Sequence, residues 1–124
     1  MTLLAANLAS RVIYSVDLGE VLSVAVGAER WSHQGPSWYD AAGKRAAGGD
    51  AVRLAALVRH LASAPAVAGY GPMPPGALRV VIGTTRGDVA LRAAGGLVGV
   101  EGRPVRYKVA PEVCERWPVV CLGR

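Results

Sequence analysis

The sequence of 124 residues contains no phenylalanine and has only two residues each of histidine, cysteine and methionine. Glycine, alanine and valine supply much of its 52% hydrophobic content, so we expect a core of small side chains with closely packed backbones. No apolar run reaches the roughly 18 to 20 residues that span a bilayer, and no basic region precedes the apolar N-terminus as in a signal peptide. Together with the length, these absences predict one domain, no membrane insertion and a cytoplasmic location.

The histidines and cysteines are too scattered to suggest a metal site. His33, His60, Cys114 and Cys121 include no pair with C-x-x-C or H-x-x-x-H spacing. The two cysteines are separated by an odd number of positions. In one straight strand their side chains would therefore face opposite ways and could not bridge without a bend. We therefore predict buried free thiols and no bound metal.

Motifs for catalysis are also missing. Ser32, His33 and Asp40 could be named as a triad, but no nucleophile elbow or oxyanion loop accompanies them. Gly95 and Gly96 lack the G-x-G-x-x-G pattern of a dinucleotide loop. The carboxylates show no paired spacing for acid-base chemistry. We therefore expect no enzyme and no cofactor.

The clearest structural signal is the stretch of residues 79–101, RVVIGTTRGDVALRAAGGLVGVE. Its hydrophobic residues alternate on both sides of a Thr-Arg-Gly-Asp segment, in which Gly87 can adopt the positive φ that hairpin turns need. This pattern predicts a β-hairpin. Gly95, Gly96 and Gly99 interrupt the apolar run that follows, which suits a strand that bends where a small barrel curves.

The first half of the chain shows strand signals separated by long loops. Alternation and β-branched content predict one strand over residues 11–16 and another over residues 21–26. Residues 31–40 are rich in turn formers and aromatics, and we interpret them as a surface loop anchored by one of their tryptophans. Residues 43–49, rich in glycine and alanine, form a second predicted loop.

One amphipathic helix is predicted over about residues 52–61, because hydrophobic residues recur there at spacings of three and four. Asp50 could cap its N-terminus. The four prolines within residues 65–76 exclude regular structure and predict an extended connector near the middle of the chain. After the hairpin, residues 105–109 and 117–122 are expected to supply the last strands.

The order of these segments resembles that of the CheW-like family, the small coupling scaffolds of bacterial chemotaxis arrays. Residues 14–24 (YSVDLGEVLSV) are similar to the family's early strand motif. Residues 38–57 (WYDAAGKRAAGGDAVRLAAL) resemble the segment that leads into its short helix. Residues 79–100 are similar to its second-half hairpin, and residues 105–122 would be its closing strands.

The resemblance implies a mainly β fold of two small five-stranded β-barrels packed together, with one short amphipathic helix. The first barrel would span about residues 1–64, the proline-rich connector residues 65–76 and the second barrel residues 77–124, and strands could exchange between the barrels. Three residues depart from the family pattern, in which proline, aspartate and aspartate are usual: Asp50, Arg53 and Gly95.

The family has no active site, so the resemblance implies a non-enzymatic adaptor in bacterial signal transduction. Its expected partners are the regulatory domain of a chemotaxis-type histidine kinase, the tip of a chemoreceptor, or another CheW-like protein. The family arginine matches Arg45, with Lys44 beside it and Trp38 or Tyr39 as an aromatic anchor. Because arginine and aromatic residues dominate many protein interfaces, these four residues form the predicted partner-binding patch.

The net charge of +5 leaves a second hypothesis, a small basic β-barrel that binds nucleic acid. Arginine supplies most of the fourteen basic residues, but they are spread along the chain with no cluster longer than Lys44-Arg45. Clustered aromatics of the kind that stack bases are missing. A steep loss of affinity with rising salt would distinguish a nucleic-acid binder from an adaptor with an apolar interface.

Overall fold

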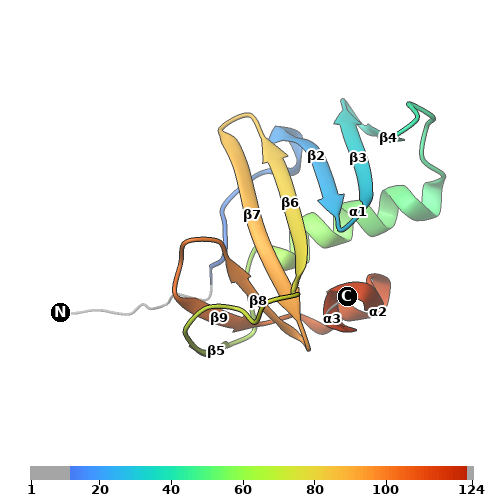
Figure 1. Cartoon of the computed structure of the whole chain (residues 1–124). Helices are drawn as coiled ribbons and strands as arrows, with labels where there is room; N and C mark the ends of the chain where they lie inside the picture. The colour runs from blue at the N-terminus through green and yellow to red at the C-terminus, as the bar shows by residue number, and fades with distance from the viewer. Residues whose placement is uncertain (1–11, 123–124) are drawn as a thin grey trace.

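The computed structural model describes residues 12–122, so the expectations for residues 1–11, including the start of the first barrel, lie outside this part. It shows a mainly β protein with one eight-stranded antiparallel sheet and short helices (Figure 1). No helix within residues 12–122 is long and apolar enough to cross a membrane. In chain order the elements are η1 (Leu18–Glu20), β2 (Val21–Val26), β3 (Glu29–Gln34), β4 (Ser37–Asp40), α1 (Gly48–Leu61), β5 (Val67–Tyr70), β6 (Leu78–Thr84), β7 (Gly87–Ala94), β8 (Leu97–Val100), β9 (Val105–Lys108), α2 (Pro111–Arg116) and α3 (Pro118–Leu122).

The sheet joins the two halves of the chain. Its strand order is β4-β3-β2-β6-β7-β8-β9-β5, so β2 of the first half pairs with β6 of the second, with Val24 opposite Ile82. The expected mainly β class is thus confirmed. The two five-stranded barrels that the resemblance implies are not shown, because strands from both halves are hydrogen-bonded in one continuous sheet.

The predicted hairpin is confirmed as β6 and β7. Val80 and Ile82 of β6 and Leu91 of β7 are fully buried in the core, as their alternation predicted. The strands meet at a tight turn closed by Thr84 opposite Gly87. The φ of Gly87 is 117°, in the region that favours glycine, so the turn depends on this residue type.

Gly95 and Gly96 have a different role from the predicted one. They form the turn between β7 and β8, with φ of 58° and 81°, and Ala94 lies opposite Leu97 at the end of the paired strands. Positive φ at both central residues gives a hairpin turn whose twist matches that of the flanking strands. The bend predicted at these two glycines is therefore wrong, because the chain reverses direction there.

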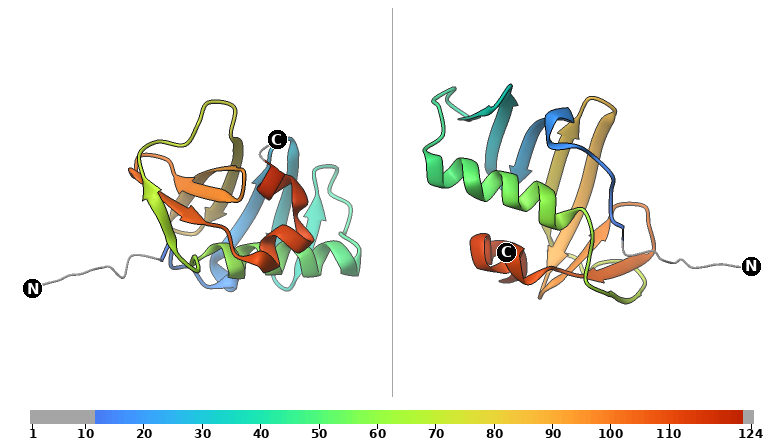
Figure 2. Two further views of the ribbon diagram at one scale, coloured as in Figure 1. Left: turned by 90° about the horizontal axis from the view of Figure 1, so that it is seen from below. Right: turned by 180° about the vertical axis from the view of Figure 1, so that it is seen from behind.

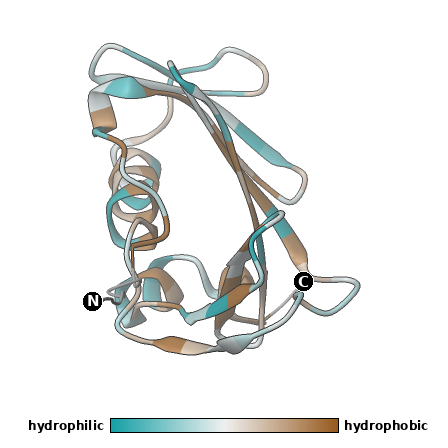
Figure 3. Ribbon diagram, turned by 90° about the vertical axis from the view of Figure 1, so that its left-hand side faces the viewer, coloured by the Kyte–Doolittle hydropathy of each residue, from teal (hydrophilic) through white to brown (hydrophobic). Residues whose placement is uncertain are grey.

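The predicted amphipathic helix is confirmed as α1, which runs across one face of the sheet (Figures 2 and 3). It begins earlier than expected, with Ala47 as its N-cap residue. Asp50 lies within the first turn, where its Oδ1 accepts a hydrogen bond from Arg53 Nη1 at 2.9 Å. The capping role predicted for Asp50 is therefore wrong. The residues of α1 that are buried against the sheet are Leu54, Leu57, Val58 and Leu61.

Residues 31–40, predicted as a surface loop, form most of β3 and β4 instead. The two strands are joined by a tight turn at Gly35, and His33 lies opposite Trp38 in their register. Only 3% of the surface of Trp38 is exposed. Burial of this large ring on the sheet outweighs the turn-forming residues around it, and the loop prediction is wrong for that reason.

Two other segments differ from prediction: one forms less regular structure than expected and the other forms more. The strand expected over residues 11–16 is not formed in its described part, where Val12 makes only an isolated bridge with Ser63. Residues 65–76 are not free of regular structure, because β5 lies among them and pairs with β9. β5 occupies the stretch between the first two prolines, where no proline removes a strand hydrogen bond.

The C-terminal segment folds into two short helices in place of the predicted last strand. α2 ends at Arg116, and the non-helical backbone of its C-cap residue, Trp117, bends the chain before α3. This bend brings the Cα atoms of Cys114 and Cys121 to 5.5 Å, and the two residues form a disulfide. The prediction of free thiols is wrong because it assumed one straight strand.

Trp117 anchors the C-terminal helices to α1. Its side chain is fully buried, and its Nε1 donates a hydrogen bond to the carbonyl oxygen of Arg53 at 2.8 Å. The Arg53 guanidinium lies 4.0 Å above the ring, and its Nε donates to the carbonyl oxygen of Arg116 at 3.1 Å. One side chain of α1 thus contacts both the indole ring and the end of α2.

We predict that Gly87→Val lowers the free energy of unfolding by about 1 kcal/mol or more, because a β-branched residue is strained at positive φ. Gly19→Ala is the control, since Gly19 has no positive φ and an added Cβ there would contact nothing. Chemical denaturation of both variants measures the difference. Equal stability of Gly87→Val and the wild type would contradict the assigned turn.

The disulfide should stabilise the fold by restricting the unfolded chain. The double variant Cys114→Ser, Cys121→Ser should lose about 2 kcal/mol of unfolding free energy, because the closed loop is short. Reduction with dithiothreitol should lower the melting temperature of the wild type and leave that of the double variant unchanged. An unaltered melting temperature after verified reduction would contradict the pairing.

Candidate functional site

The predicted partner-binding patch lies at one edge of the sheet. β4 is the terminal strand of the sheet, and the loop of residues 41–47 follows it, close to the loop predicted over residues 43–49. Lys44 and Arg45 are exposed in this loop, and Tyr39 is half-buried on β4. A backbone bridge between Tyr39 and Arg45 brings the three residues together.

Hydrogen bonds hold this loop against β4. Asp40 Oδ1 accepts from the backbone N–H groups of Ala42 and Lys44, each at 2.9 Å. The Asp40 N–H donates to the Lys44 carbonyl oxygen at 2.8 Å. The Ala46 N–H donates to the Trp38 carbonyl oxygen at 2.8 Å. The chain itself therefore occupies this part of the β4 edge and fixes the backbone of the loop.

Trp38 does not belong to the exposed patch. Its ring stacks on that of His33 with centroids 4.1 Å apart, and His33 Nδ1 donates to the Val21 carbonyl oxygen at 2.9 Å. Trp38 is therefore part of the core, and the expectation that it contacts a partner is corrected. Of the two proposed anchors, Trp38 and Tyr39, it is Tyr39 that keeps an accessible surface.

Lys44 and Arg45 supply the positive charge of the patch. Among residues 12–122, no ion pair or side-chain hydrogen bond involves the charged group of either residue. Asp40 is close in sequence, but its Oδ1 accepts from backbone N–H groups of the loop. Both cations are thus available to an acceptor other than the described residues.

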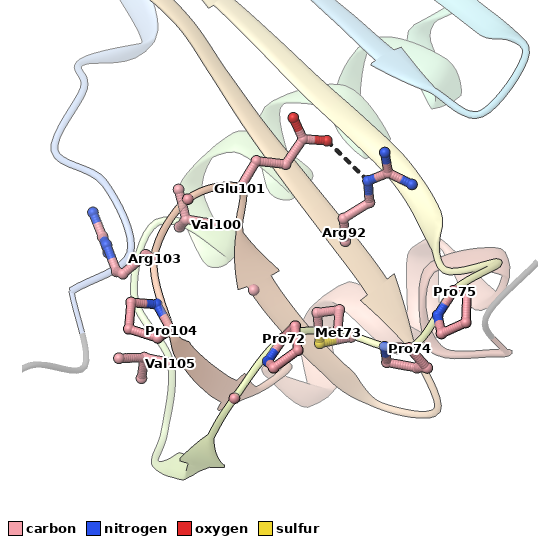
Figure 4. A pocket seen from close by; sticks show the side chains of 13 residues that line it. Pro72, Met73, Pro74, Pro75, Arg92, Val100, Glu101, Arg103, Pro104 and Val105 are labelled. Carbon is pink, nitrogen blue, oxygen red and sulfur yellow. Dashed lines mark hydrogen bonds and ion pairs between the residues drawn. The ribbon is translucent and has the colours of Figure 1, made fainter.

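A second candidate site is a hollow at the other end of the sheet, where β8, β9 and β5 lie (Figure 4). Its volume is about 530 Å³, and its wall is formed by residues 71–75 and 99–105 with Arg92. Met73 packs over Gly99, where an added Cβ would lie only 2.9 Å from Met73 Cγ. We call this cavity the proline hollow, because prolines form much of its wall.

Glu101 lies at one end of the proline hollow and binds two arginines, of which Figure 4 shows Arg92. Arg79 and Arg92 lie opposite each other on β6 and β7, and their Nε atoms donate to Glu101 Oε2 at 3.0 and 2.8 Å. These hydrogen bonds, from Arg79 first and then from Arg92, lower the pKa of Glu101. The carboxylate offsets the repulsion between two arginines in register.

The sequence contained only part of the signal for the proline hollow. Strand alternation puts Arg79 and Arg92 on the side of the hairpin away from the core, but only the register places them opposite each other. The prolines were interpreted as a connector, because nothing local shows that residues 71–75 pass beside β8. The hollow was therefore missed.

Comparison with known proteins identifies no family for this chain: no family model, curated protein or solved structure matches it. Within residues 12–122, no group of three or more histidine, cysteine, aspartate or glutamate side chains is placed to hold a metal ion. The patch at β4 and the proline hollow are therefore interpreted from their own geometry and chemistry.

The pKa of Glu101 should depend on Arg92. A carbon-detected NMR titration is expected to give a pKa below that of an exposed glutamate, and Arg92→Gln should raise it by removing one hydrogen bond to the carboxylate. Arg30→Gln is the matched control, because Arg30 is exposed and has no ion pair among the described residues.

The lowered pKa also sets the sign of the effect on stability. A carboxyl group whose pKa falls on folding stabilises the protein above its unfolded pKa, and this contribution is lost as pH falls through the folded pKa. Arg92→Gln should therefore reduce the gain in stability between acidic and neutral pH. An identical pH dependence in the variant and the wild type would contradict the contact.

Proposed function

We propose that this chain is a non-enzymatic CheW-like adaptor that couples a chemotaxis-type histidine kinase to chemoreceptors, or to another signalling partner, through protein contacts. The observation that carries the proposal is the loop of residues 41–47, which is fixed against β4 while Lys44 and Arg45 have no charged partner in the described chain. The order of the sequence segments supports CheW-like partners in particular. Arg45 is the central contact, with Lys44 and Tyr39 beside it.

A loop that is already ordered favours binding, because less conformational entropy is lost when the partner docks. Asp40 provides this order through both its carboxylate and its backbone N–H. Arg45 presents five N–H donors on a planar guanidinium, which suits the carboxylates or carbonyl oxygens of a partner. The ring of Tyr39 adds a rigid surface that is apolar on its faces and polar at its tip.

The two-barrel arrangement is part of this proposal, and it is based on five strands at one end of the sheet. Strands β6, β7, β8, β9 and β5 are consecutive neighbours in the sheet. β5, β8 and β9 turn away from the long β6-β7 hairpin and form a curved end of the sheet (Figure 2). We propose that these five strands make up the second barrel of a CheW-like fold, with β5 contributed by the connector.

The proposed setting is the bacterial cytoplasm, where CheW-like adaptors act. Disulfides are rare in that compartment because thiols are kept reduced there, so the bond between Cys114 and Cys121 counts against this setting. The disulfide joins α2 and α3, whereas the proposed patch is formed by β4 and the loop after it. The patch shares no residue with the disulfide, and its proposed role does not require the bond.

Arg45→Glu should weaken binding of the partner at least tenfold, or about 1.4 kcal/mol, because it reverses the main charge of the patch. The melting temperature should stay nearly unchanged, since an exposed loop charge contributes little to stability. The measurement uses a purified CheW-like regulatory domain of a chemotaxis histidine kinase and a chemoreceptor tip fragment from the source bacterium, each immobilised and titrated with the wild type or the variant.

Arg59→Glu is the matched control, since it makes the same charge change at an exposed arginine of α1 that has no ion pair in residues 12–122. An equal loss of binding in both variants would indicate a general charge effect and reject the patch. Failure of the wild type to bind either protein would reject the proposed partners. Capture of nucleic acid that falls steeply with salt would support the basic β-barrel in place of the adaptor.

A further inference from the structure

We infer that the proline hollow binds a carboxylate carried on an apolar body, such as an aromatic acid. The volume of about 530 Å³ lies within the range of roughly 300 to 1,000 Å³ that is usual for small-molecule sites. The hollow and the patch at β4 lie at opposite ends of the strand order, so this inference stands independently of the adaptor function.

The wall of the hollow offers an apolar ligand few hydrogen-bond donors to desolvate. The backbone N–H groups of Gly71, Glu101 and Arg103 already donate to backbone carbonyl oxygens. Met73 contributes a flexible thioether chain, which adapts to irregular apolar shapes. Four further lining residues are prolines and have no backbone N–H: Pro72, Pro74, Pro75 and Pro104.

Arginine supplies the donors that remain. Arg92 uses Nε to bind Glu101, while its Nη1 and Nη2 have no partner among residues 12–122. Arg79, opposite it on β6, also binds Glu101 through Nε alone. Arg103 also lines the hollow, but its Nη1 already donates to the carbonyl oxygen of Ile13 at 3.1 Å and to the Tyr107 hydroxyl at 3.2 Å. The charged residues that line the hollow are two arginines, Arg92 and Arg103, and one glutamate, Glu101, so the lining carries a net positive charge.

A carboxylate matches these donors better than a neutral acceptor does. The two Nη groups of a guanidinium can bind both carboxylate oxygens, and such charge-assisted hydrogen bonds are roughly twice as strong as neutral ones. An apolar body attached to that carboxylate would contact Met73 and the prolines. An aromatic ring suits this role because it is rigid and loses little conformational freedom on binding.

The test is a titration of the whole protein, measured by calorimetry and by the shifts of backbone amide NMR signals. The four ligands are 2-naphthoate, its neutral amide 2-naphthamide, acetate, and a Leu-Asp dipeptide with blocked ends. We expect 2-naphthoate or the dipeptide to bind with a Kd of about 1 mM or below, and to shift Met73, Gly99 and Val105. The amide and acetate should bind at least tenfold more weakly. Tighter binding of 2-naphthoate supports a small acid as the natural ligand, and tighter binding of the dipeptide supports an acidic segment of a protein.

Two variants distinguish the contribution of the Arg92 charge to binding from that of the cavity. Arg92→Gln should weaken binding of the favoured carboxylate at least tenfold, whereas Arg30→Gln, which alters an exposed arginine on β3, should bind it like the wild type. Val105→Phe fills part of the hollow without changing a charge and should also weaken binding. Equal binding of 2-naphthoate and 2-naphthamide, wild-type affinity in Arg92→Gln, or no binding of either carboxylate would overturn the inference.

Discussion

The pairing of β2 with β6 is the interaction on which the rest of the fold depends, because it joins the two halves of the chain. Val24 and Ile82 lie opposite each other at this junction and are fully buried, and α1 covers the same face of the sheet (Figure 2). Gly83 lies opposite Ser23 in this pairing, and a Cβ at Gly83 would clash with Ser23 Oγ unless that side chain moved. Without this pairing, β4, β3 and β2 would form a small separate sheet that shares no core with the β6-β7 hairpin.

The same junction decides where the two candidate sites lie. β4 is at one edge of the sheet and β5 at the other, so the Arg45 loop and the proline hollow are presented at opposite ends of one framework. Each site depends on a carboxylate used in a different way. Asp40 orders the backbone that carries Arg45, whereas Glu101 binds the side chains of two arginines directly. In both arrangements, guanidinium groups keep N–H donors that have no hydrogen-bond partner among the described residues.

Prediction from sequence succeeded for the strands and the helix whose buried residues recur at a regular spacing. Val80 and Ile82 recur every second residue, and Leu54 and Leu57 recur at helical spacing, so the hairpin and α1 were both found. It failed at Trp38, because a ring buried on a sheet looks in sequence like an aromatic in a loop. For the candidate sites, the exposure of Lys44 and Arg45 was foreseen from the small residues around them, whereas the proline hollow was not.

The sequence by itself determined the elements whose causes lie within a few residues: the β6-β7 turn at Gly87, the apolar face of α1 and the exposed glycine- and alanine-rich loop that carries Arg45. Tertiary structure alone decided the partner of β2, the bend at Trp117 that pairs the cysteines, and the approach of residues 71–75 to Gly99. The physical reason is that a turn or an amphipathic face is fixed by backbone sterics and local periodicity. Contacts between distant segments are selected only when the whole core packs, because each depends on burial that no single segment provides.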